Sequence, residues 1–134
     1  MSLMGFAFPA PVVATTLPTI IGTSAAGAGT YTLNTLRYVK WGKTIDFDIY
    51  LIWTAHTGTG NMKVEGLPVA ASGAGSPCYV MVSTMALANP IYAYVDNNAT
   101  TISLVTAALA SGAETAVPLD TAATLRVSGR YFIA

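Results

Sequence analysis

Charged residues are scarce in this chain. Only 9% of the 134 residues carry charge, against about 25% in an ordinary soluble domain, whereas 53% are hydrophobic. A single domain of this length needs a polar surface, so the shortage predicts that other subunits cover part of it. Six basic and six acidic residues cancel to a net charge of zero, which argues against a nucleic-acid partner.

Long apolar runs are absent as well. Gly, Thr, Ser, Asn and Pro interrupt every hydrophobic stretch before it reaches the ~18 residues of a membrane-spanning helix. Met1–Val13 lacks the basic start of a secretory signal. We therefore expect no membrane insertion and no export peptide. Residues 1–16 are interpreted as an N-terminal extension in which 1–3 resemble an expression remnant.

Cysteine and histidine occur once each. Cys78 has no partner for a disulfide or a zinc cluster and is expected to be a small core residue. His56 lies in a turn rich in Thr and Gly, where we expect it to be exposed, with contact to a glycan or a partner as the alternative. No nucleophile motif accompanies it, although a general base needs one within reach. The sequence therefore predicts no catalytic residue, no metal site, no cofactor and no enzymatic activity.

The chain does contain the residue pattern of a β protein, in which Gly, Pro and Asn separate runs of β-branched and aromatic residues. The clearest strand is Thr44–Thr54, in which five large apolar side chains alternate with polar ones. Its inward residues are Ile45, Phe47, Ile49, Leu51 and Trp53, and its outward residues are Asp46, Asp48 and Tyr50. The other expected strands are Pro18–Thr23, Tyr31–Lys40, Asn61–Glu65, Cys78–Thr84, Ile91–Val95, Thr100–Thr106 and Thr124–Ala134.

The connections agree with this pattern. Trp41-Gly42-Lys43 is expected to form a tight hairpin, and Asp96–Ala99 a second one in which Asn98 takes a left-handed backbone. Ala107–Ala116 is expected to be a loop. Seven or eight short antiparallel strands, with no useful helix to cover them, predict an all-β, jelly-roll-like antiparallel β-sandwich as a single domain over 17–134.

The outward residues suggest two kinds of contact. Asp46 and Asp48 have a spacing that suits glycoside hydrolysis or Ca²⁺ binding, yet no cleft motif surrounds them, so ion pairing is preferred. Arg126 and Arg130, on the outer face of the last strand, are the expected partners. Aromatic faces pack at interfaces or stack on sugar rings. The candidate surface or glycan contacts are His56, Tyr50, Tyr92 and Tyr94, of which the last two share one strand face, with Trp41 and Tyr79 as further aromatics of interest. Packing in the core or at a trimer interface is the preferred role of these aromatics, and sugar contact is the alternative.

The order and spacing of several short motifs resemble a known domain. These motifs are Leu17–Gly22, Gly29–Thr32, Arg37–Gly42, Ile45–Trp53, Thr57–Asn61, Gly66–Pro68 and Leu125–Tyr131. Together they resemble the C-terminal β-sandwich domain of bacteriophage tail fibres and related virion appendage proteins. The resemblance implies a non-catalytic homotrimer in the virion that contacts other virion proteins and attaches to a glycan or protein receptor on the bacterial surface. It assigns no individual receptor-binding residue.

One departure leaves an alternative open. Fibre domains usually follow a long repetitive shaft, which this chain does not contain. The alternative is a free-standing bacterial, prophage-derived carbohydrate-binding or adhesin-like β-sandwich. A small glycan-cleaving enzyme is a weaker third interpretation.

Overall fold

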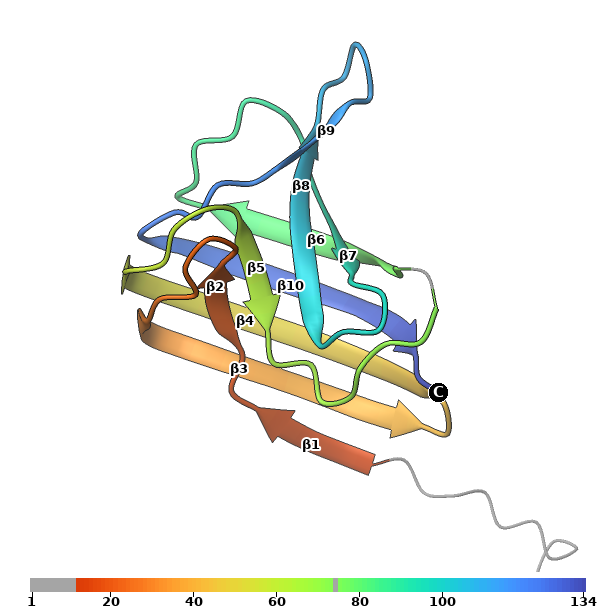
Figure 1. Cartoon of the computed structure of the whole chain (residues 1–134). Helices are drawn as coiled ribbons and strands as arrows, with labels where there is room; N and C mark the ends of the chain where they lie inside the picture. Colours follow the sequence, from red (N-terminus) through yellow and green to blue (C-terminus); the bar gives the residue numbers. More distant parts are fainter. Residues whose placement is uncertain (1–11, 74) are drawn as a thin grey trace, which may run out of the picture.

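The computed structural model describes residues 12–73 and 75–134, and these residues are organised almost entirely as β-strands and turns (Figure 1). The all-β class predicted from the sequence is confirmed. In the described part of the chain, no helix is long and apolar enough to cross a membrane. The strands are β1 (Val12–Thr16), β2 (Thr19–Gly22), β3 (Gly29–Trp41), β4 (Thr44–His56), β5 (Met62–Glu65), β6 (Pro77–Ser83), β7 (Ile91–Val95), β8 (Thr101–Ala107), β9 (Glu114–Ala116) and β10 (Ala123–Phe132).

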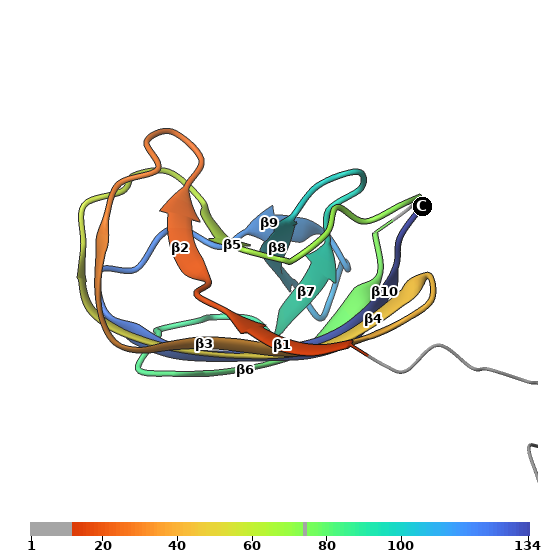
Figure 2. The same ribbon diagram turned by 90° about the horizontal axis from the view of Figure 1, so that it is seen from below.

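All strand pairs are antiparallel and belong to one continuous sheet. Its order is β1-β3-β4-β10-β6-β7-β8-β5-β2, with β9 added beside β8. The sheet curls into a half-barrel, so that β2, β5, β7 and β8 lie over the long strands β3, β4 and β10 (Figure 2). The bend lies at the joint between β6 and β7, where Pro77 and Cys78 pair with Tyr94 and Ala93. The predicted antiparallel pairing is confirmed, whereas a sandwich of two separate sheets is not.

Two strands were not expected from the sequence. β1 lies within the range interpreted as an N-terminal extension and pairs along its whole length with β3. β9 lies within the predicted loop Ala107–Ala116 and pairs with the end of β8, so the loop prediction is wrong for Glu114–Ala116. Both strands are short, and among the described residues each pairs with a single neighbouring strand.

The turns follow the local chemistry of the chain. Gly42 has a φ of 54° in the β3–β4 hairpin, and Asn98 has the same φ in the β7–β8 hairpin. This confirms the expected left-handed backbone at Asn98. The first hairpin pairs Trp41 with Thr44, which determines the register of the two longest strands.

The core lies between the long strands and the short strands that curl over them. The five inward residues predicted on β4 are only 0–4% exposed, which confirms the register of that strand. On β10 the alternation buries Leu125, Val127 and Tyr131, also as expected. The Phe47 ring meets the Tyr131 ring edge-on, with centroids 5.8 Å apart. Strands β4 and β10 are therefore the centre of the fold.

Two polar groups of the core are satisfied by backbone carbonyls. The Tyr131 hydroxyl donates to the carbonyl of Val69 at 2.8 Å, and burial raises the pKa of Tyr131 to about 12. Trp53 Nε1 donates to the carbonyl of Asp120 at 2.9 Å. Cys78 is half-buried and packs against the core, and burial raises its thiol pKa to about 11. A protonated thiol of this kind is a poor nucleophile at neutral pH.

Candidate functional site

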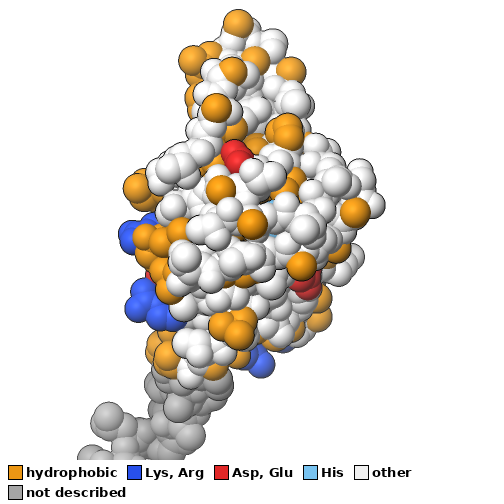
Figure 3. Space-filling view, turned by 90° about the vertical axis from the view of Figure 1, so that its left-hand side faces the viewer, with side chains coloured by type: hydrophobic (Ala, Val, Ile, Leu, Met, Phe, Trp, Pro, Cys, Tyr) orange, Lys and Arg blue, Asp and Glu red, His pale blue; other side chains and the backbone are white. Residues whose placement is uncertain are grey.

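One surface of the molecule brings together arginine, aspartate and exposed aromatic side chains. The outward residues of β1, β3, β4, β10 and β6 form it, and we call it the outer face. All three arginines of the chain lie there, Arg37 on β3 and Arg126 and Arg130 on β10. In the space-filling view, most of the visible Lys and Arg side chains gather at the left edge beside hydrophobic ones, whereas acidic side chains are scattered and most of the remaining visible surface is uncharged (Figure 3).

Two ion pairs lie in the middle of the outer face, and each joins two neighbouring strands. Arg37 donates to Asp48 at 2.7 Å, and Arg130 donates to both oxygens of Asp46 at 2.7 and 3.3 Å. Each pair joins residues that are directly opposite in neighbouring strands. The expected pairing of Arg130 with the β4 carboxylates is therefore confirmed. Both pairs are exposed to solvent, so they orient side chains more than they stabilise the fold.

Arg126 behaves differently from the other two arginines. Its guanidinium lies over the Tyr50 ring, 4.0 Å from the centroid. The predicted pairing of Arg126 with a β4 carboxylate is wrong, because the register places Tyr50 opposite it and commits both aspartates to Arg37 and Arg130. Cation–π contact of this type contributes roughly 0.5–1 kcal/mol at an exposed position.

Exposed apolar side chains surround these charges. Tyr79 and Met81 on β6 are 68% and 51% exposed, and Trp41 and Phe132 are exposed where β3 and β10 end. Tryptophan, tyrosine, phenylalanine, methionine and arginine are the residue types enriched where proteins meet partners. The outer face therefore has the composition of an interface.

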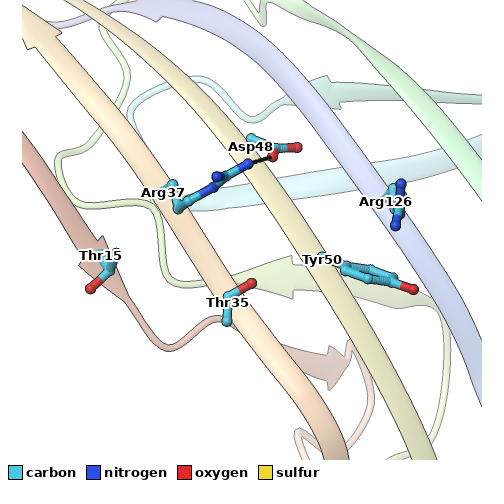
Figure 4. A pocket seen from close by; sticks show the side chains of 6 residues that line it. All are labelled: Thr15, Thr35, Arg37, Asp48, Tyr50 and Arg126. Atoms are coloured by element: carbon cyan, nitrogen blue, oxygen red, sulfur yellow. Dashed lines mark hydrogen bonds and ion pairs between the residues drawn. The ribbon is translucent and has the colours of Figure 1, made fainter.

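A shallow hollow of about 380 Å³ lies in the outer face (Figure 4). We call it the Arg126 hollow; its lining residues are Thr15, Thr35, Arg37, Asp48, Tyr50 and Arg126. They come from four adjacent strands and all project from the same side of the sheet. A second hollow of about 210 Å³ shares Tyr50 and Arg126 and continues toward Met81 on β6.

His56 is not on this surface, and its expected exposure is wrong. It is 8% exposed, its Nδ1 accepts from the Gly58 N–H at 2.9 Å, and Nε2 therefore donates to the carbonyl of Ile20 at 2.7 Å. The Ile20 N–H in turn donates to the Tyr31 hydroxyl at 2.7 Å. The two side chains thus bind both backbone groups of Ile20 and link β2 to the ends of β3 and β4. His56 has a structural role in closing the curled sheet.

The other sequence candidates are divided between two sides of the molecule. Tyr50 lies on the outer face, beneath Arg126. Tyr92 and Tyr94 do share one strand face, but they lie on the short-strand layer, where Tyr94 is opposite Ser103 of β8. Tyr92 is exposed and Tyr94 half-buried. The three tyrosines therefore do not form one site.

A second polar cluster was not expected from the sequence. Asp96 accepts hydrogen bonds from Lys63 at 2.8 Å, Thr101 at 2.5 Å and Ser103 at 2.6 Å. Burial alone would raise the pKa of Asp96, but the hydrogen bonds from these three residues outweigh it and hold the pKa below its usual value. Because each donor serves this one carboxylate, the cluster ties β5 and β8 to the β7–β8 turn and functions as a structural network.

Across residues 12–73 and 75–134, no three His, Cys, Asp or Glu side chains come together in a way that could hold a metal ion.

No family model, no curated protein and no solved structure matches the chain. The resemblance to phage tail-fibre domains therefore stays a prediction from the sequence motifs.

Proposed function

We propose that the chain is a non-catalytic assembly and host-recognition domain of a bacteriophage tail fibre or related virion appendage. The observation that carries the proposal is the concentration of all three arginines and several exposed aromatic and methionine side chains on one sheet face. The motif order over 17–134 adds the class of protein. In this proposal the two layers of the curled sheet correspond to the halves of a jelly-roll-like β-sandwich.

Homotrimer formation is proposed to use one margin of the outer face. Among the described residues, only Pro77 and Cys78 of β6 pair with β7, so Tyr79–Ser83 has a backbone partner on the β10 side alone. Tyr79 and Met81, which we call the β6 margin, stand exposed along this free edge. An open edge bearing apolar side chains is a liability unless another chain covers it.

If the β6 margin is the trimer contact, the oligomeric state should depend on its two side chains. Wild-type protein should have three times the chain mass of 13.8 kDa in light scattering. The double variant Tyr79→Ser, Met81→Ser should be a monomer with a similar melting temperature, because both side chains point away from the core. Leu109→Ser, in the β8–β9 turn at 85% exposure, is the matched control and should stay trimeric. A wild-type monomer at micromolar concentration would contradict the trimer.

Recognition is tested with fluorescently labelled protein on intact bacterial strains. We expect saturable binding to some strains, and competition by surface polysaccharide extracted from those same strains. Labelled Tyr79→Ser, Met81→Ser protein should bind more weakly, because a trimer presents three sites to one cell surface. Absence of binding to every strain, together with a monomeric mass, would refute the proposed function.

A free-standing carbohydrate-binding domain is the second candidate, and the Arg126 hollow favours it equally. The two candidates differ in assembly. Glycan binding by a stable monomer would support the free-standing domain, whereas glycan binding by a trimer supports the appendage.

A further inference from the structure

We infer that the Arg126 hollow binds a carboxylated sugar of a bacterial surface polysaccharide. This inference rests on the proposed function, and it specifies the class of ligand that the domain recognises. The hollow combines an uncommitted guanidinium, an aromatic ring and hydroxyl groups within one shallow depression.

The guanidinium of Arg126 is the strongest element of the site. Arg37 and Arg130 each direct their donors to a neighbouring aspartate, whereas within the described residues no carboxylate lies within ion-pair distance of Arg126. Its stacking on Tyr50 occupies one planar face and leaves the edge donors accessible. A guanidinium edge matches the two oxygens of a carboxylate in a bidentate geometry.

The remaining lining residues suit a sugar. Thr15 on β1 and Thr35 on β3 line the part of the hollow away from Arg126, on the same side of the sheet, where their hydroxyl groups can donate to and accept from sugar hydroxyls (Figure 4). The Tyr50 ring, which holds the Arg126 guanidinium, adds an aromatic group to the lining of the hollow. The volume of about 380 Å³ lies in the range of small-ligand sites.

The charge of the lining selects an acidic ligand. Two arginines and one aspartate leave the hollow with an excess of one positive charge, although the whole chain is neutral. A neutral sugar would leave the Arg126 donors to water, whereas a uronic-acid carboxylate would pair with them.

The test uses two defined probes with the full-length chain. One is a tetrasaccharide of alternating glucuronate and N-acetylglucosamine, and the other is a galacturonate trisaccharide. Calorimetry should detect binding of at least one of them, and the same oligosaccharide with its carboxyls reduced to alcohols should bind about tenfold more weakly or worse. Equal binding of the reduced form, or no binding of either acidic probe, would overturn the inference.

Arginine variants then locate the site. Arg126→Gln should weaken binding of the acidic probe about tenfold, and Arg126→Lys should recover part of it, because an ammonium keeps the charge without the planar fork. Arg130→Gln, on the same strand and outside the hollow, is the matched control and should change the affinity less than about twofold. If Arg126→Gln binds as wild type does, the assignment is wrong.

A direct mapping experiment protects the test from effects on folding. Backbone amide NMR signals of wild-type protein should shift on titration at Thr35, Tyr50 and Arg126, and not at Tyr92 or Tyr94. Shifts confined to the short-strand layer would place the site elsewhere. Equal competition by inorganic phosphate or by a polyglutamate peptide would show a general anion site and overturn the sugar assignment.

The results separate this inference from the proposed function. A trimer that binds cells but ignores both acidic probes refutes the carboxylated-sugar site and leaves the appendage proposal standing. A monomer that binds an acidic probe through Arg126 supports the site and refutes the appendage.

Discussion

Replacing Phe47 with alanine is expected to give insoluble or unfolded protein. Phe47 is 4% exposed on β4, the strand between β3 and β10, and its ring packs against Tyr131. Truncation of a buried phenylalanine costs about 3–5 kcal/mol, a large share of the ~5–15 kcal/mol that stabilises a typical domain. Soluble yield and thermal melting measure the effect.

Tyr50→Ala is the matched control, because Tyr50 lies on the opposite side of the same strand. Its ring contacts Arg126 on the outer face and not the core. We expect this variant to fold and to melt close to wild type, while losing affinity for the acidic oligosaccharide. If Phe47→Ala and Tyr50→Ala melted alike, the register of β4 and every inward and outward assignment derived from it would be wrong.

The inward and outward faces of the long strands could be predicted because they depend on local alternation. Five large apolar residues at every second position of Thr44–Thr54 allow only one side to face a core. The cross-strand partner of Arg37 could also be predicted from the β3–β4 hairpin. A two-residue turn at Gly42-Lys43 pairs Trp41 with Thr44, and counting back from it places Arg37 opposite Asp48.

The failed prediction for His56 has a definite physical cause. Strict alternation from Trp53 would turn Ala55 inward and His56 outward. The β3–β4 pairing shifts register near Thr30 and Tyr31, so Thr54 has no opposite partner and the alternation changes phase. A bulge of this kind arises from the pairing of two distant segments, and neither strand shows it alone.

The curl of the sheet and the Arg126 hollow depend on still longer-range pairing. β2 pairs with β5, and β5 pairs with β8. The place of β2 in the sheet therefore depends on two pairings between segments that are distant in the sequence. The stacking of Arg126 on Tyr50 depends on the register between β4 and β10, which are joined by a long connection instead of a hairpin. Alternation predicted that both residues face outward, but it could not predict that they meet.

The second large effect is expected at the Asp96 network. Asp96→Asn should lower the free energy of unfolding at pH 7 by about 2 kcal/mol, because charge-assisted hydrogen bonds contribute roughly 1.5–3 kcal/mol. The amide removes the negative charge that faces Lys63, and its NH₂ group meets donors where the carboxylate accepted. Chemical denaturation measures the loss.

The pH dependence distinguishes this network from general acid denaturation. Since the folded pKa of Asp96 lies below its ordinary value, its stabilisation is complete above the unfolded pKa of about 3.9 and is lost as the pH falls through the folded pKa. The stability difference between wild type and Asp96→Asn should therefore shrink as the pH falls below about 4. Asp48→Asn, in the exposed pair with Arg37, is the control and should cost less than about 1 kcal/mol at pH 7. A constant difference for Asp96→Asn from pH 7 to pH 2 would show that the carboxylate charge does not stabilise the fold, and that shape alone holds β5, β8 and the turn together.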